Sequence, residues 1–219
     1  MRRRAAVVLA ALALDALAAQ DDKRLAIPQQ LFTPPPAGSY ALPPIQQAPR
    51  GTVLDDQGRS RSLAGYLQGH ITLLSFIYTH CTDPAGCPLA IATLAAVRDR
   101  LAARPETARA QLVSLSFDPQ YDTPDVMRLF SKTYDSAGKK PGWHFLTTAS
   151  APQLAPLLAG FGQDAAVADV PGGPRRLDHT LRVFLIDPRS RVREIYSSAY
   201  LMPDVIVNDI LTLDAETPR

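Results

Sequence analysis

Two dense apolar runs constrain the fold of this 219-residue chain more than any other feature of its sequence. Residues 71–79 (ITLLSFIYT) and 110–117 (AQLVSLSF) contain too few polar residues to alternate between a core face and a solvent face. Such runs are typical of strands that are buried on both faces. Between them, residues 88–106 begin with a proline and carry apolar residues at helical spacing. A strand, a helix and a second strand in this order predict an α/β domain.

The rest of the chain continues this alternation of strands and helices. A turn signal at residues 56–58 (DQG) predicts a β-hairpin at the start of the domain, and Thr123 followed by Pro124 predicts the start of a helix. The elements expected after it are a helix over 122–134, a strand over 143–148, a helix over 150–162, a hairpin of strands 179–187 and 191–198, and a helix over 203–214. The predicted fold class is α/β, a mixed sheet flanked by helices on both faces, with an N-terminal β-hairpin.

Residues 1–18 have the pattern of an export signal. Three arginines precede an apolar stretch over residues 5–14, and small residues follow at 16–18. The stretch is shorter than the roughly 20 residues that span a bilayer, and Asp15 interrupts it, so a cleaved signal is favoured over a short N-terminal anchor. Export predicts a location in the periplasm, where disulfides persist.

The remainder of the chain divides into a tether and one domain. Residues 19–49 are rich in proline, which cannot donate the backbone hydrogen bonds of a helix or an interior strand, so an extended tether is expected. Residues 50–219 are long enough for one well-buried core. Without the export segment, acidic and basic residues balance, which gives no electrostatic reason to expect a nucleic acid or an anionic membrane as partner.

Both cysteines of the chain, Cys81 and Cys87, follow the first apolar run, and Cys87 directly precedes Pro88. A structural disulfide between them would contribute only roughly 2 kcal/mol, in a domain large enough not to need it. A thiol–disulfide switch is compatible with Cys87 as a helix N-cap, where the helix dipole stabilises a thiolate, although the usual redox spacing is C-x-x-C. A copper site would use both thiolates and a neutral imidazole as a third ligand.

Four histidines are candidates for that imidazole. His70 is expected in a solvated loop, and His144 is expected in a strand with a structural role. His80 adjoins Cys81, but neighbouring residues of an extended chain point to opposite faces. His179 starts an apolar strand after a loop rich in glycine and proline, so it can approach the cysteines if its strand neighbours theirs. The spacing alone leaves the choice of ligand open.

Four segments, in this order, resemble the Sco family, also called SenC or PrrC. They are residues 73–81 with the Cys-Pro at 87–88 (LLSFIYTHC…CP), 113–130 (VSLSFDPQYDTPDVMRLF), 143–147 (WHFLT) and 178–192 (DHTLRVFLIDPRSRV). The resemblance covers the chain from about Gly51 to Asp214. It implies a thioredoxin-like fold and a copper-binding protein of cytochrome c oxidase assembly.

Matched residue by residue, the resemblance implies that Cys81, Cys87 and His179 bind copper, as Cu(I) or Cu(II). It implies a chaperone more than an enzyme, one that delivers copper to a respiratory metalloprotein such as the dinuclear copper centre of the oxidase. A dithiol reductant would keep its cysteines reduced. The alternative is a thiol–disulfide reductase that uses Cys81 and Cys87 as a redox pair on the client's cysteines, and a third possibility is a binding module with a structural disulfide.

The cysteine motif departs from the family pattern. The family has C-x-x-x-C-P, whereas here five residues (TDPAG) separate Cys81 from Cys87. A peroxidase of the same fold is disfavoured, because its T-x-x-C motif would require threonine at position 78, which is Tyr78. Asp118 and Asp122 are expected to cap a turn and a helix. Tyr78 and Thr79 are expected to support the site by packing and hydrogen bonding.

Overall fold

A six-stranded mixed sheet, with strand order β1-β10-β9-β4-β5-β6, forms the centre of the protein. The computed structural model describes residues 27–104, 107–134, 140–168 and 176–216. The strands of the sheet are β1 (Gln46–Gln47), β4 (Ile71–Ile77), β5 (Ala110–Ser116), β6 (Trp143–Leu146), β9 (Arg182–Ile186) and β10 (Arg191–Ser197). Strands β4, β5 and β6 are parallel, and β9 pairs with β4 in the antiparallel sense.

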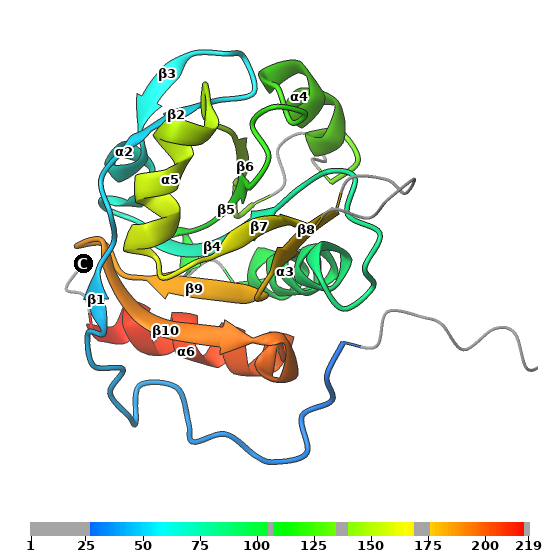
Figure 1. Cartoon of the computed structure of the whole chain (residues 1–219). Coiled ribbons are helices and arrows are strands. Elements are labelled where there is room, and N and C mark those ends of the chain that lie inside the picture. The colour runs from blue at the N-terminus through cyan, green and yellow to red at the C-terminus, as the bar shows by residue number, and fades with distance from the viewer. Residues whose placement is uncertain (1–26, 105–106, 135–139, 169–175, 217–219) are drawn as a thin grey trace, which may run out of the picture.

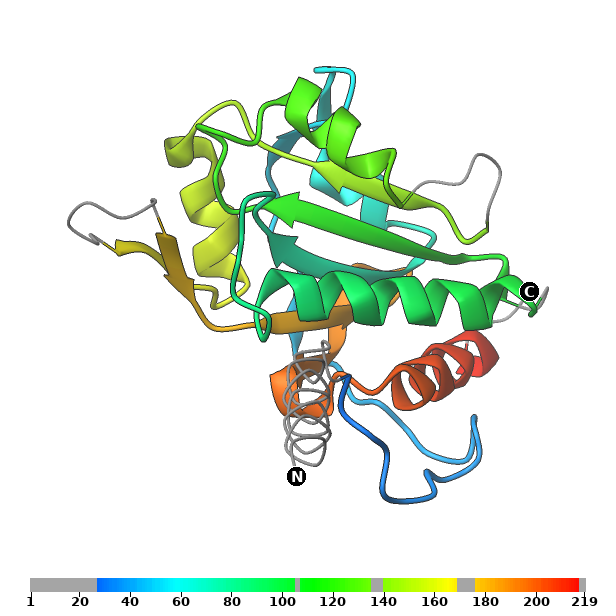
Figure 2. The ribbon, with the colours of Figure 1, turned by 90° about the vertical axis from the view of Figure 1, so that its right-hand side faces the viewer.

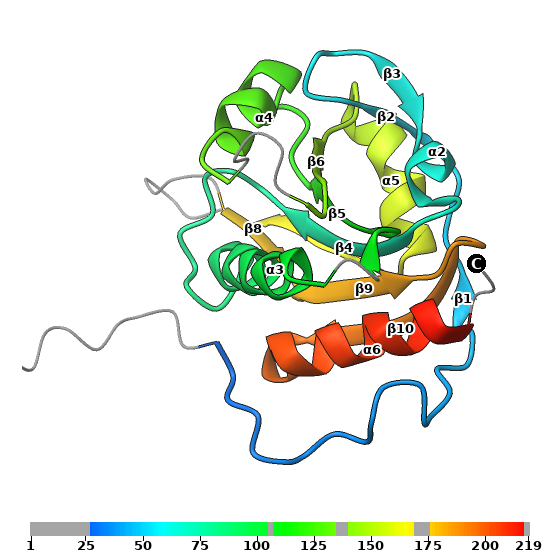
Figure 3. The same ribbon diagram turned by 180° about the vertical axis from the view of Figure 1, so that it is seen from behind.

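Helices cover both faces of this sheet. The helices are α2 (Leu63–Leu67), α3 (Cys87–Ala102), α4 (Pro124–Ser131), α5 (Ala151–Gly160) and α6 (Pro203–Glu216), with a 3-10 turn η2 at Ser198–Tyr200. Helix α5 lies in front of the sheet in Figure 1, and α3 and α6 lie in front of it in the reverse view of Figure 3. The view between these two shows α5 and α6 on opposite sides of the strands (Figure 2). The predicted fold class is confirmed, including the N-terminal hairpin, which is formed by β2 (Thr52–Leu54) and β3 (Ser60–Ser62).

The two apolar runs form the central strands as predicted. Every residue of β4 and β5 is buried, and the strands pair in register from Ile71 opposite Ala110 to Ile77 opposite Ser116. The predicted start of α4 is also confirmed, because the Thr123 side chain accepts a hydrogen bond from the Val126 amide at the N-cap.

Two predictions near the cysteines and His179 were wrong in detail. Helix α3 begins at Cys87 itself, with Gly86 as N-cap, so Cys87 is the first helical residue and not the cap. A second hairpin, β7 (Ala165–Ala168) with β8 (Arg176–His179), was not predicted, because its strands are short and β7 lacks a polar alternation. His179 therefore ends this outer hairpin and does not begin β9.

The segment expected to be a tether contacts the domain along part of its length. Residues 35–48, called the N-terminal strap from here on, run beside α6 with a turn at residues 36–39, and β1 within them pairs with β10 (Figures 1 and 3). Its polar contacts to α6 include Tyr40 Oη to Asp209 Oδ1 (2.5 Å), Asn208 Nδ2 to the Pro35 carbonyl (2.9 Å) and to Tyr40 Oη (2.8 Å), and the Gly38 amide to Thr212 Oγ1 (3.0 Å). The predicted export segment, residues 1–18, and residues 19–26 lie outside the described residues. Within the described part of the chain, no helix has the length and apolar character needed to cross a bilayer.

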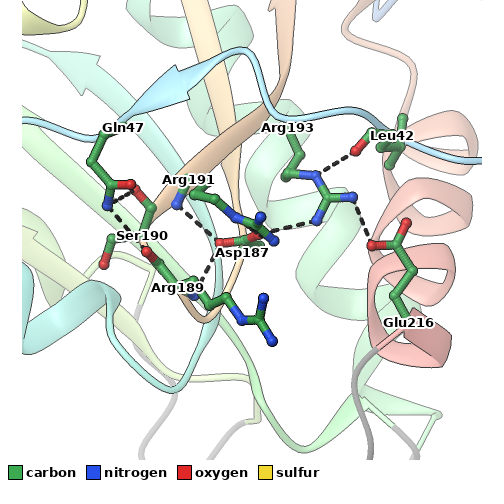
Figure 4. Close-up of polar contacts among 8 residues, drawn as sticks. All are labelled: Leu42, Gln47, Asp187, Arg189, Ser190, Arg191, Arg193 and Glu216. Carbon is green, nitrogen blue, oxygen red and sulfur yellow. Dashed lines mark hydrogen bonds and ion pairs between the residues drawn. The ribbon is translucent and has the colours of Figure 1, made fainter.

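The β2–β3 and β9–β10 hairpins have turns built in the same way. In the second, Asp187 Oδ1 accepts from the amides of Arg189 and Arg191 (2.9 Å each), and Oδ2 accepts from Arg191 Nε (2.8 Å) and Arg193 Nη1 (3.0 Å), as Figure 4 shows. The fourth turn residue, Ser190, has a left-handed backbone with φ of 60°.

Asp55 makes the matching contacts in the first turn. Its Oδ1 accepts from the amides of Gln57 (3.0 Å) and Arg59 (2.9 Å), and its Oδ2 accepts from Arg59 Nε (2.7 Å) and pairs with Arg61 Nε at 3.7 Å. Gly58 takes the left-handed position with φ of 74°. The pattern D-x-x-x-R-x-R therefore specifies both turns.

Candidate metal centre

Cys81, Cys87 and His179 meet at one end of the central sheet. Strand β4 ends four residues before Cys81, and Cys87 begins α3. His179 ends β8, three residues before the first residue of β9, and β9 is the antiparallel neighbour of β4. The neighbouring strands that the sequence analysis required are therefore present, and His179 Nε2 lies 3.9 Å from Cys87 Sγ.

The His179 ring is held by its backbone and by two aromatic residues. Its Nδ1 atom lies 3.2 Å from the Leu177 carbonyl oxygen. Because a carbonyl can only accept, Nδ1 carries the proton, and the lone pair of Nε2 faces the thiols. The ring centroid is 4.6 Å from that of Phe117 and 5.8 Å from that of Tyr78. This is the tautomer in which an imidazole binds a metal through Nε2.

The two thiols have different surroundings. Cys87 is 3% exposed, and its sulfur accepts a hydrogen bond from the Tyr78 amide at 3.4 Å. Its pKa is raised, first by the hydrogen bond that joins it to Cys81 and then by burial. Cys81 is partly exposed, and the hydrogen bonds from Cys87 and Tyr78 lower its pKa despite partial burial. The two shifts have opposite directions and favour ionisation of Cys81 over ionisation of Cys87.

The donor set fits a soft metal ion. Two thiol sulfurs and a neutral imidazole nitrogen are ligands that suit copper. A metal bonded at about 2.3 Å to sulfur and about 2.0 Å to nitrogen would place these donors roughly 3.5–3.8 Å apart, close to the observed Cys87–His179 separation. Among the described residues, no group of three or more His, Cys, Asp or Glu side chains has the geometry of a preformed metal site.

Of the two aspartates near the site, Asp122 has a different role from the one expected, and Asp118 has the expected one. Asp122 was expected to cap a helix, but its buried carboxylate accepts from the Thr79 amide (3.1 Å) and from the hydroxyls of Thr79 and Ser116 (2.5 Å each). It thereby ties the segment before the cysteines to the end of β5. Asp118 closes the expected turn, since its carbonyl accepts from the amides of Tyr121 and Asp122.

The other histidines lie away from the thiols or have different partners. His80 Nε2 is 3.6 Å from Asp118 Oδ2, and its ring packs against Tyr78 and Tyr121. His144 is on β6 as predicted and packs against Tyr66, in a groove of about 340 Å³ beside the β2–β3 hairpin. The sequence analysis missed the contact between His179 and Leu177, although the Pro-Gly-Gly-Pro signal between residues 165–168 and 176–179 could have predicted the hairpin that creates it.

Comparisons with known proteins agree with this fold. The SCO1/SenC family model matches residues 49–213. The chain is 27% identical over 161 residues to the SCO1 protein homolog of Bacillus subtilis, which spans 73% of this chain and 78% of the relative. The structure of Arabidopsis thaliana ScoI with copper bound superposes with a TM-score of 0.67 at 20% identity and covers 78% of this chain and 99% of that one.

A further similar structure is that of BsSco, described as a member of the Sco family of cytochrome c oxidase assembly proteins with a disulfide switch. It superposes with a TM-score of 0.62 at 25% identity and covers 80% of this chain and 98% of BsSco. The family model covers most of the chain and nearly all of the central sheet. The chain therefore belongs to the SCO1/SenC family.

Proposed function

We propose that this protein binds one copper ion through Cys81, Cys87 and His179 and delivers it to a respiratory metalloprotein. The observation that carries the proposal is the position of the Cys87 sulfur at the start of α3, 3.9 Å from Nε2 of His179. Copper is the cargo in this function, and the three side chains hold it until an acceptor's ligands replace them.

The relatives support copper as the cargo and an oxidase as its destination. Arabidopsis ScoI binds copper, and BsSco belongs to a family of cytochrome c oxidase assembly proteins. By this analogy the acceptor is an oxidase subunit, such as the one that carries the dinuclear copper centre. Because a disulfide cannot bind copper as two thiolates can, a dithiol reductant must first reduce Cys81 and Cys87.

The proposed location is the periplasm. The export pattern of residues 1–18 supports it, and the prolines of residues 19–49 would separate that segment from the domain. A SCO1/SenC family protein from Bacillus anthracis is a lipoprotein, which supports a tethered location outside the cytoplasm. Edman sequencing of the mature protein from a periplasmic fraction would test the cleavage near residue 18.

The copper site is tested by anaerobic titration of the reduced protein with Cu(I) against a chromophoric chelator. The expected result is one tightly bound ion, bound at least ten-fold more weakly by His179→Ala and not bound by the double variant Cys81→Ser/Cys87→Ser. His144→Ala is the matched control, because His144 is an exposed histidine on β6, away from the thiols. Binding that ignores His179 would contradict the three-ligand site.

A thiol–disulfide reductase is the second candidate, and the lowered pKa of the partly exposed Cys81 favours it. In that reaction Cys81 attacks a client disulfide, Cys87 displaces the client's thiolate, and the client leaves as a dithiol while Cys81 and Cys87 form a disulfide. Electron exchange requires only the cysteines. If His179→Ala leaves the reduction of a client disulfide unchanged while copper binding is absent in the wild type, the reductase is the correct function.

A further inference from the structure

His179 lies outside the central sheet that positions the cysteines. It ends β8, which pairs with β7 in a separate two-stranded sheet, and Ala165 is its partner there. Figure 2 shows this hairpin, in dark yellow, projecting from one end of the central sheet. The hairpin is joined to β9 through Thr180 and Leu181. The distance from His179 to Cys87 therefore depends on how this junction is held.

The end of α5 holds the junction through a glutamine side chain. Gln163 follows α5 and is 2% exposed, and its Nε2 atom donates a hydrogen bond to the Thr180 carbonyl at 2.9 Å. The backbone of Gln163 is fixed as well, because its amide donates to the Leu158 carbonyl inside α5 at 2.8 Å. A second link joins Arg182 Nη1, at the start of β9, to the Gly162 carbonyl. The end of α5 therefore contacts both the junction and the first residue of β9.

The second polar atom of the Gln163 side chain is unpaired. Because a carbonyl can only accept, the NH2 group of Gln163 faces Thr180, and the Oε1 atom is buried with no hydrogen-bond partner among the described residues. A buried polar atom without a partner destabilises the folded state, and a leucine would fill much of the same space without that cost. The hydrogen bond to Thr180, in contrast, requires a donor at this position.

We infer that Gln163 is a positioning residue, whose side-chain amide holds the Thr180 carbonyl and thereby keeps His179 within reach of Cys87. The inference rests on the proposed copper site and adds a residue outside the ligand set. Thr180 directly follows His179, so a shift of its carbonyl moves the backbone of the histidine. His179 Nε2 lies 3.9 Å from Cys87 Sγ, and a displacement of about 1 Å is enough to spoil a binding site of this kind.

Gln163→Leu tests this role, because it removes the hydrogen bond and the unpaired oxygen and keeps most of the side-chain volume. The Cu(I) affinity of the reduced protein is measured by the chelator titration, once in the wild-type background and once in the His179→Ala background. We expect binding to weaken about five-fold in the wild-type background, as the loss of one hydrogen bond predicts, and less than about two-fold in the other. This difference identifies a residue that acts through His179, because a general loss of structure would weaken binding in both backgrounds.

Gln111→Leu is the matched control. Gln111 is a buried glutamine of β5 whose Nε2 atom donates to the Tyr66 carbonyl and to Thr72 Oγ1 (3.0 Å), near the start of β4 and away from the cysteines. This variant should bind Cu(I) within about two-fold of the wild type. If Gln163→Leu lowers the melting temperature, Gln163→Met, which has a more adaptable side chain, is measured in the same way. A folded variant with unchanged affinity, or one that weakens binding equally in both backgrounds, would overturn the inference.

Amide hydrogen exchange of the metal-free protein separates this inference from the proposed function. The amides of residues 177–181 should exchange about five-fold faster in Gln163→Leu than in the wild type, because opening of the junction then breaks one hydrogen bond fewer. If the wild type binds no copper but this exchange is faster, the copper function is wrong and the positioning of the junction stands. If the wild type binds copper tightly and Gln163→Leu changes neither affinity nor exchange, the copper site stands and the role of Gln163 is wrong.

Discussion

The Nε2 atom of His179 lies 3.9 Å from the Sγ atom of Cys87, although the two residues are 92 positions apart in the chain. Their contact depends on the pairing of β4 with β9, in which Ser75 is opposite Val183. Cys87 follows β4 in the chain and His179 precedes β9, so both lie at the same end of this strand pair. The site is therefore a product of the sheet and not of a local motif.

The two thiols are expected to differ in reactivity. Cys81 is partly exposed and its pKa is lowered, first by its hydrogen bond with Cys87, whereas Cys87 is buried and its pKa is raised. Iodoacetamide should therefore modify Cys81 at least ten-fold faster than Cys87 at pH 7 in the reduced protein, as measured by peptide mass spectrometry. The rate at Cys81 should fall only as the pH drops through its lowered pKa.

Equal rates at the two cysteines would contradict this asymmetry. Cys81→Ser is the control, because it removes the hydrogen-bond partner that raises the pKa of Cys87. In that variant Cys87 remains buried but should react faster than it does in the wild type.

Asp209 is expected to hold the N-terminal strap on α6. Its buried carboxylate accepts from Tyr40 Oη at 2.5 Å and from Tyr196 Oη at 2.7 Å. Asp209→Ala leaves both hydroxyls without this acceptor and should lower the free energy of unfolding by about 2 kcal/mol. It should also speed proteolytic cleavage within residues 35–45, which limited proteolysis would detect. Asp204→Ala, at an exposed position of the same helix, should change neither quantity.

The same carboxylate should make stability depend on pH. Burial raises the pKa of Asp209, against the lowering effect of the two tyrosine hydrogen bonds. Because the folded state holds the proton more tightly than the unfolded state, stability from this group is greatest below the unfolded value near 4 and is lost as the pH rises through the raised folded pKa. Urea unfolding between pH 4 and 8 should show a smaller decline for Asp209→Asn than for the wild type. An identical decline in both proteins would assign the pH dependence to other groups.

Arg193 is expected to be costly to remove. It is 6% exposed and pairs with Asp187 at 3.0 Å and with Glu216 at 2.6 Å, and it also donates to the Leu42 carbonyl of the strap (Figure 4). Arg193→Ala leaves buried charge without its partner and should cost about 3 kcal/mol in urea unfolding.

The matched control is Arg100→Ala, which removes an exposed pair with Asp204 at 2.6 Å. Exposed pairs contribute at most about 1 kcal/mol, so this variant should unfold close to the wild type. If the two substitutions cost the same, burial does not decide the strength of the Arg193 contacts.

Ser190 is expected to be a position where glycine stabilises the protein. Its φ of 60° is a left-handed conformation, and its buried hydroxyl oxygen has no hydrogen-bond partner among the described residues. Ser190→Gly should raise the free energy of unfolding by up to about 1 kcal/mol, because glycine adopts this conformation without strain. Gly58→Ala, at the corresponding position of the other turn, should lower it by about 1 kcal/mol.

The sequence predicted the parts of the fold that depend on local patterns. The unbroken apolar runs identified β4 and β5, and the Thr-Pro pair identified the start of α4. The spacing of the residues did not decide whether His179 lies beside the cysteines, because this depends on which strands are neighbours in the sheet. The family resemblance supplied that information.

The features that were missed depend on contacts between distant segments. The position of Asp122 before a helix predicts a helix cap. Its carboxylate instead accepts hydrogen bonds from three donors in β5 and in the segment before the cysteines. The prolines of residues 19–49 predict an extended tether, whereas the attachment of the strap within this segment depends on the contact of Tyr40 with Asp209 in α6. No local pattern contains either contact.

The two hairpin turns share one set of hydrogen bonds, which depends on residues of the turn and not on the rest of the fold. In each turn, one aspartate carboxylate accepts hydrogen bonds from two backbone amides and from one arginine side chain, all within five residues. The turn is therefore stabilised by its own residues. An insertion of even one residue between the aspartate and the arginine would break these hydrogen bonds. The sequences of the flanking strands can change without that effect. We therefore expect the sequence motif D-x-x-x-R to form the same turn when it is engineered between other antiparallel strands.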